Sequence, residues 1–179
     1  MILSLYESFR HWSYTGGVYL IGDLNFSNKE DRRVITEEQV NILNNAVYPD
    51  DTLVVLGNVG NAEYMKHIRA GRKVLIMGRQ DTLRDCGASF SEIYRGALII
   101  SEKIILTHEP VDILWCLNIH GSKHNGMQRW ESKVGDQVCR HLDLSAEACN
   151  RQPVSLNVIL KKYNFSEIPS IYGQKNDPE

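Results

Sequence analysis

The sequence lacks several features that would place it in a specialised class of protein. It has no internal repeat, no low-complexity tract and no long run of one charge. Its 179 residues carry 22 acidic and 20 basic side chains, so the formal net charge is only −2. A charge so close to zero argues against a protein whose affinity comes mainly from neutralising a nucleic-acid backbone. Nucleic acid is therefore not expected as the main partner.

Long hydrophobic runs and closely paired cysteines are also missing. No stretch approaches the ~18 apolar residues of a transmembrane helix. The first residues include Glu7, Arg10 and His11, so they lack the apolar core of a signal peptide. The four cysteines show no C-x-x-C spacing, which indicates buried, reduced thiols and no zinc knuckle or redox dithiol. We therefore expect one cytoplasmic domain without membrane contact.

Three short apolar runs, at 18–21, 52–56 and 73–77, each end in glycine and polar residues. Thr36 and Gln39 form a capping box that predicts a helix over 36–47, and Asn61 caps a second helix to about 68. Strands that alternate with helices predict a sheet with crossover helices. A functional site is then expected where the carboxyl ends of the strands meet.

The rest of the chain predicts a different arrangement. A hairpin is expected from 98–100 and 104–107, further strands at 117–120 and 138–144, and a last helix to about 163. This gives a main domain over 16–163, followed by a loosely held polar tail over 164–179. Residues 1–15 are expected to form an amphipathic extension that packs on the domain or binds a partner. Its apolar stripe consists of Ile2, Leu5, Tyr6, Phe9 and Trp12.

The turns that follow the strands carry the functional information. In order, they read Gly22-Asp23-Leu24-Asn25, Gly57-Asn58, Gly78-Arg79-Gln80-Asp81, Thr107-His108-Glu109-Pro110 and Asn118-Ile119-His120-Gly121-Ser122-Lys123-His124. This series resembles the calcineurin-like metallophosphoesterases, whose pattern is Asp-x-His, Gly-Asp, Gly-Asn-His-Asp, a lone His and Gly-His-x-His. The resemblance covers residues 18–163. It implies an α/β fold, the metallophosphoesterase sandwich of two mixed β-sheets flanked by helices.

The resemblance also implies a centre of two divalent metals that generate a hydroxide nucleophile. This chain keeps three of the family's seven metal ligands and changes the remaining ones, together with the catalytic histidine. The retained ligands are Asp23, His108 and His124. The changed positions are Asn25 for His, Asn58 for the bridging Asp, Arg79 for Asn, Gln80 for the catalytic His and Ser122 for His.

These changes weaken metal binding most at the second metal. Arg79 is not a ligand, and at about 5 Å its charge would cost roughly 3 kcal/mol per unit of metal charge. Gln80 cannot act as a general acid at neutral pH. We expect no cofactor, or at most one weakly bound divalent ion such as Mn, Fe, Ni or Zn. Its ligands would be Asp23, Asn25, Asn58 and His124, with His108 nearby.

Three functions fit these residues. The first is a catalytically inactive scaffold or inhibitor that binds a protein, with the stripe at residues 2–12 and the turn Ile113-Leu114-Trp115 as candidate contact surfaces. The second is a weak one-metal phosphodiesterase with His108 as acid or base. The third is a phosphate- or nucleotide-binding module in which Arg79, Gln80 and Ser122 hold the anion. A metal-free site would also allow an ion pair between Arg79 and Asp23. We favour the first function.

Overall fold

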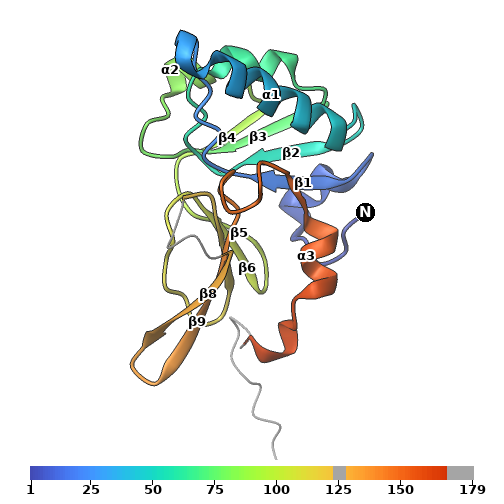
Figure 1. The fold of residues 1–179 in the computed structure, drawn as a ribbon. Helices are drawn as coiled ribbons and strands as arrows, with labels where there is room; N and C mark the ends of the chain where they lie inside the picture. The colour runs from blue at the N-terminus through green and yellow to red at the C-terminus, as the bar shows by residue number, and fades with distance from the viewer. Residues whose placement is uncertain (123–127, 169–179) are drawn as a thin grey trace, which may run out of the picture.

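The structure is a computed structural model that describes residues 1–122 and 128–168. It consists of two mixed five-stranded sheets flanked by helices (Figure 1). The strands of one sheet are β1 (Val18–Ile21), β2 (Thr52–Val55), β3 (Arg72–Ile76), β4 (Glu92–Tyr94) and β10 (Val154–Ser155). Those of the other are β5 (Leu98–Ser101), β6 (Ile104–Thr107), β7 (Leu117–His120), β8 (Arg129–Val134) and β9 (Gln137–Asp143). The helices are η1 (Glu7–Ser13), α1 (Glu30–Ala46), η2 (Ala62–His67), α2 (Leu83–Cys86), α3 (Leu156–Lys162) and η3 (Phe165–Glu167), with η denoting 3₁₀ geometry.

The first sheet has the order β10-β1-β2-β3-β4, and the second has the order β5-β6-β7-β9-β8. Strands β1 to β4 are parallel to one another, whereas β10 is antiparallel to β1. In the second sheet β6, β7 and β9 are parallel, and β5 and β8 are antiparallel strands at its two edges. The predicted strands at 18–21, 52–56, 73–77, 117–120 and 138–144 and the predicted hairpin are therefore confirmed, with shifts of one residue at some ends.

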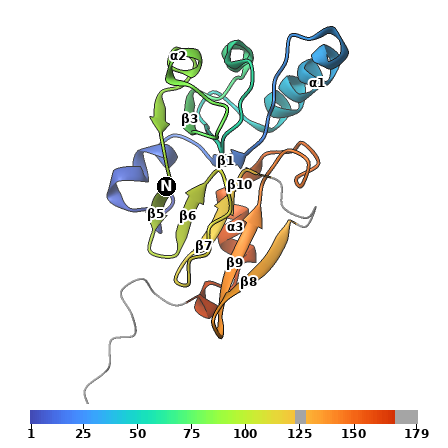
Figure 2. The same cartoon turned by 90° about the vertical axis from the view of Figure 1, so that its left-hand side faces the viewer.

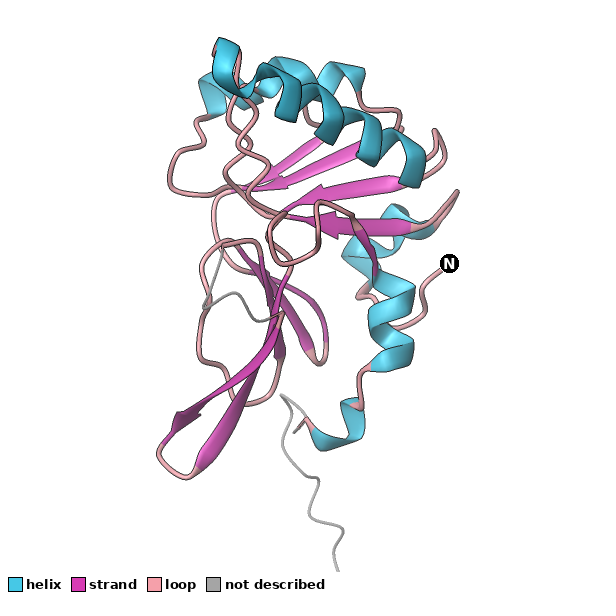
Figure 3. Ribbon diagram, viewed as in Figure 1, coloured by secondary structure: helices cyan, strands magenta, loops and turns pink. Residues whose placement is uncertain are grey.

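Successive side chains along the strands of the first sheet alternate between its two faces. One face packs against α1 and η2, which lie on its outer side (Figure 3). The other face packs against the second sheet, and α3 covers the far side of this core (Figure 2). The side chains that join the two sheets include Val18, Leu20, Val54, Ile76, Ile100, Leu106, Leu117 and Ile119. This two-sided burial explains why the three parallel strands read as continuous apolar runs.

The N-terminal stripe packs into this core. Ile2, Leu5 and Trp12 are almost fully buried in the cluster between the sheets. They are therefore not available as a partner surface, which corrects that interpretation of the stripe. The helix in this segment is also shorter than expected, since only Glu7–Ser13 is helical and its geometry is 3₁₀.

A single carboxylate on β4 holds the N-terminal segment to the sheet. Glu92 accepts hydrogen bonds from His11 Nε2 (2.8 Å), Trp12 Nε1 (3.0 Å), Arg72 Nη1 (2.8 Å) and the Tyr94 hydroxyl (2.9 Å). Burial raises the pKa of Glu92, but the hydrogen bonds from Trp12, His11 and Tyr94 outweigh it, so the net pKa lies below the usual glutamate value. Burial and the bond to Glu92 raise the pKa of Tyr94 to about 12.

Two helix predictions need correction. Helix α1 begins at Glu30, six residues before the position that the capping box indicated. The Thr36 hydroxyl instead accepts a hydrogen bond from Ser27 N (3.1 Å), while Glu30 and Asp31 provide the negative charge that favours a helix N-terminus. The second helix is 3₁₀ over Ala62–His67, although Asn61 caps it as predicted by accepting from Glu63 N (3.1 Å).

The beginning of the predicted tail is packed, in contrast to the expectation of a loose segment. Residues 165–167 form η3, and Ile168 is buried against the core between the sheets. The tail from 169 onward lies outside the described residues. Within the described part of the chain, no helix is long and apolar enough to cross a membrane.

Candidate functional site

The carboxyl ends of strands from both sheets meet at one place in the molecule. A parallel bridge pairs Gly22, after β1, with Ser145, after β9, and Gly22 N donates to Leu144 O (2.7 Å). A Cβ atom on Gly22 would lie 2.2 Å from Gly121 Cα, so a side chain at Gly22 would prevent this close approach of the backbones. The turns that the sequence singled out are therefore neighbours across the two sheets.

The first two turns have an unusual backbone conformation. Asp23, Asn25 and Asn58 have φ angles of 50°, 48° and 49°, in the left-handed region that Asn and Asp tolerate better than most residues. Asp23 N donates to Gly57 O (3.0 Å), and Asn25 N donates to Asn58 O (2.9 Å). The structure thus brings these three predicted site residues into adjacent turns.

Asp81 ties the second turn to the third. Its buried carboxylate accepts hydrogen bonds from the backbone N–H groups of Asn58 (2.8 Å), Val59 (2.9 Å) and Gly78 (2.8 Å). Asp81 was not identified as a site residue from the sequence. The signal was present, because the residue matches the last position of the family's Gly-Asn-His-Asp pattern. Its carboxylate fixes the geometry of the strand ends, and backbone N–H donors occupy most of its hydrogen-bonding capacity.

His108 lies at the end of β6 and is buried. Its Nδ1 atom is 2.9 Å from Leu56 O, and since a carbonyl oxygen only accepts, Nδ1 carries the hydrogen. The Nε2 atom lies 3.6 Å from Glu109 Oε1. His108 therefore has one ring nitrogen committed to the scaffold and the other turned toward a carboxylate.

The same carboxylate is the partner of Arg79. Arg79 Nε lies 3.2 Å from Glu109 Oε1, and 79% of the Arg79 side chain is exposed. Arg79 therefore pairs with Glu109 and does not form the ion pair expected with Asp23, because the packing of the second sheet on the first brings the turn after β6 to the turn after β3. Glu109 was not identified as a site residue from the sequence, where it is only part of the His-Glu-Pro turn.

The remaining predicted residues lie around this group. Gln80 is exposed, and its backbone N–H points at Asn58 Oδ1 (3.4 Å). Ser122 is half-buried, and its backbone N–H donates to His108 O (2.8 Å). His124, the last predicted ligand, lies outside the described residues.

The donor chemistry does not fit a two-metal centre. At the position that the resemblance assigns to the bridging carboxylate, the chain has the neutral amide of Asn58, and at another assigned ligand position it has the guanidinium of Arg79. No group of three His, Cys, Asp or Glu side chains among residues 1–122 and 128–168 is placed to hold a metal ion. The single site predicted from Asp23, Asn25 and Asn58 includes His124, so it stays a prediction.

The strand ends open onto a cavity of 400 Å³ between the first turn and α1. Asp23 and Asn25 line one side of it, and Thr36 and Gln39 line the other. Arg151 forms part of the wall, with Nε donating to Gln39 Oε1 (3.0 Å) and Nη2 to the carbonyl oxygen of residue 35 (2.7 Å). This wall could not be predicted from the sequence, because residue 151 follows the second sheet in the chain and lies more than 100 positions after α1.

Comparisons with known proteins concern the fold. No protein-family model and no curated protein matches the sequence. The protein of unknown function AQ665 from Aquifex aeolicus aligns with a TM-score of 0.57 at 24% identity, over 81% of this chain and 98% of its own. A single mutant of Vps29 from Entamoeba histolytica aligns with a TM-score of 0.40 at 18% identity, over 73% of this chain and 74% of its own.

Proposed function

We propose that this chain is a catalytically inactive protein of the calcineurin-like metallophosphoesterase fold that acts by binding another protein, as a scaffold or an inhibitor. The two-sheet architecture and the order of the turn motifs support the fold assignment. The observation that carries the functional proposal is the contact of Glu109 with both Arg79 and His108. The charges of Arg79 and Glu109 offset each other at the strand ends. Gln80 stands at the position where the metallophosphoesterases that the sequence resembles have their catalytic histidine.

The turns are suited to binding because their shape is fixed in advance. Backbone hydrogen bonds hold the first turn to the second, and Asp81 holds the second to the third. A surface that does not need to be ordered on association loses less conformational entropy when a partner binds. Arg79 and Gln80 are exposed on this surface, and Ile35, on the α1 wall of the adjoining cavity, is 55% exposed. Trp115 provides an exposed aromatic side chain on the 113–115 turn.

The absence of catalysis is tested with bis-p-nitrophenyl phosphate in the presence of Mn²⁺ or Ni²⁺. We expect no turnover above that of a D23A variant, together with less than stoichiometric metal in the purified chain. Turnover that disappears in D23A, with one bound metal per chain, would instead establish the one-metal phosphodiesterase.

The binding face is tested by placing a photo-crosslinking amino acid at Gln80. The matched control carries the same group at Val134, which is exposed at the far end of the β8–β9 hairpin. We expect a crosslinked partner at position 80 that is absent at position 134 and is lost when R79E is added. If nucleotides raise the melting temperature of the wild type but not of R79A, and no specific crosslink forms, the anion-binding function replaces this proposal.

A further inference from the structure

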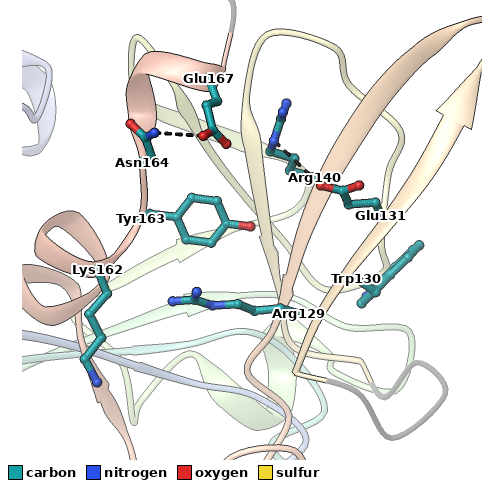
Figure 4. Close-up of a pocket in the computed structure, with 8 residues that line it drawn as sticks. All are labelled: Arg129, Trp130, Glu131, Arg140, Lys162, Tyr163, Asn164 and Glu167. Carbon is teal, nitrogen blue, oxygen red and sulfur yellow. Dashed lines mark hydrogen bonds and ion pairs between the residues drawn. The ribbon is translucent and has the colours of Figure 1, made fainter.

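A second cavity lies away from the strand ends, between α3–η3 and the β8–β9 hairpin. Its volume is 410 Å³, within the range of small-molecule sites, and it shares no lining residue with the strand-end cavity. Figure 4 shows the side chains that form its walls. They are Arg129, Trp130, Glu131, Arg140, Lys162, Tyr163, Asn164 and Glu167.

The charges in this cavity are unevenly placed. At one end, Arg140 Nε lies 3.9 Å from Glu131 Oε1, and Glu167 accepts a hydrogen bond from Asn164 Nδ2 (2.8 Å) (Figure 4). At the other end lie the cationic groups of Arg129 and Lys162. Neither has a carboxylate within 4.0 Å among the residues that the structure describes.

Tyr163 holds the Arg129 side chain in place. The Arg129 guanidinium carbon lies 5.0 Å from the centre of the Tyr163 ring, a distance that suits a cation–π contact. This contact orients the guanidinium without neutralising it, as an ion pair would. Burial raises the pKa of Tyr163, against the lowering effect of the charges on Arg129 and Arg140, so its phenol remains a hydrogen-bond donor.

The cationic end borders a further cavity whose walls include both polar and aliphatic side chains. Arg129, Lys162 and Tyr163 also line a neighbouring cavity of 290 Å³. The other walls of that cavity are mainly aliphatic side chains from β9 and the residue just after it, from β10 and from α3. These are Leu142, Leu144, Val154, Val158 and Ile159, with Gln128 at the edge.

We propose that these two neighbouring cavities, which share Arg129, Lys162 and Tyr163, form a binding site for a small amphiphilic anion, a molecule with a phosphate or carboxylate head and an apolar body. The head would lie between Arg129 and Lys162, where a guanidinium and an ammonium offer charge-assisted hydrogen bonds. The body would lie against the aliphatic walls and release water from apolar surface. Trp130 lines the 410 Å³ cavity only at its edge, because its ring stacks on that of His141, with 3.7 Å between the ring centres.

The test titrates the full-length chain by calorimetry with 1-naphthylmethylphosphonate, an anion that cannot be hydrolysed as a phosphate ester. Methylphosphonate serves as the head alone and 1-naphthylmethanol as the body alone. We expect saturable binding of the complete probe, and binding about ten-fold weaker or more for each half, because each half loses one of the two sets of contacts. No saturable binding of the complete probe would overturn the proposal.

Variants locate the bound anion. K162Q and R129Q should each weaken binding of the probe about ten-fold, the effect of losing one charge-assisted hydrogen bond. K161Q is the matched control, since it removes the same charge one residue earlier on α3 but outside the cavity lining. If R129Q lowers the melting temperature strongly, K162Q decides, because Lys162 is exposed. Equal weakening by K161Q and K162Q, or loss of binding in R79Q alone, would overturn the assignment.

Discussion

The substitution D81A probes the contacts that hold the strand ends together. The Asp81 carboxylate accepts from the N–H groups of Asn58, Val59 and Gly78 at 2.8 to 2.9 Å. Each such bond to a charged acceptor contributes about 1.5 kcal/mol or more. Water can partly replace the acceptor at Asn58 and Gly78, which are half-buried, but not at Val59, which is fully buried. We therefore expect D81A to lower the free energy of unfolding by about 3–4 kcal/mol.

The assay is thermal and denaturant unfolding of D81A beside D50A, which removes the same charge from an exposed residue. A loss of 3–4 kcal/mol in a chain of this length corresponds to a melting temperature lower by about 6–16 °C. It should leave a folded protein, because domains have about 5–15 kcal/mol of stability. Hydrogen exchange at Asn58, Val59 and Gly78 should accelerate in D81A only. A loss below about 1 kcal/mol, equal to that of D50A, would refute the assigned role of Asp81.

Further predictions concern the N-terminal anchor, the thiols and the glycine contacts. E92Q should destabilise the chain most at neutral pH, as measured by unfolding from pH 7 to 3. Because the folded-state pKa of Glu92 is lowered, the difference in stability between wild type and E92Q should shrink as the pH falls below about 4. Cys116 and Cys149 are buried with pKa values raised to about 11, so a thiol reagent at pH 8 should modify them only after unfolding. G121A should destabilise the chain by several kcal/mol, since the added Cβ would lie 1.8 Å from a backbone carbonyl oxygen. G96A should leave the melting temperature nearly unchanged, because no atom lies within 4 Å of the added Cβ. Equal melting temperatures for these two glycine variants would contradict the close packing described at the strand ends.

The parallel part of the fold could be predicted because its strands are buried on both faces. Leu53 and Val54, for example, pack on opposite sides of the first sheet, so their burial appears in the sequence as an unbroken apolar run. Strand β8 was missed for the opposite reason. Its residues, from Arg129 to Val134, are mostly polar and largely exposed, and all six pair with β9. Periodicity within a segment cannot reveal a strand that depends on its neighbour.

The candidate site was predictable to a similar extent. Asp23, Asn25 and Asn58 could be placed together because parallel strands bring their carboxyl ends to one edge. The contact between Arg79 and Glu109 could not be predicted, because it depends on how the second sheet is set against the first. Sequence motifs locate the turns of such a site, but they do not show which charged side chains pair across it.

Most of the hydrogen bonds that shape the strand ends do not use the side chains at the positions where the metallophosphoesterases that the sequence resembles have their metal ligands. Backbone bonds between the first two turns involve N–H and C=O groups of Asp23, Gly57, Asn25 and Asn58, and these groups exist whatever the side chains are. Asp81 holds the third turn through backbone N–H groups as well. The geometry of the turns can therefore persist when ligand side chains are replaced by residues, such as Asn and Asp, that tolerate a φ angle near 50°. Such independence would allow a fold of this kind to lose its metal chemistry and keep a rigid surface for a partner. We therefore expect substitutions at Arg79 to alter binding at this face with little effect on the melting temperature. The exposed ion pair of Arg79 contributes at most about 1 kcal/mol to stability.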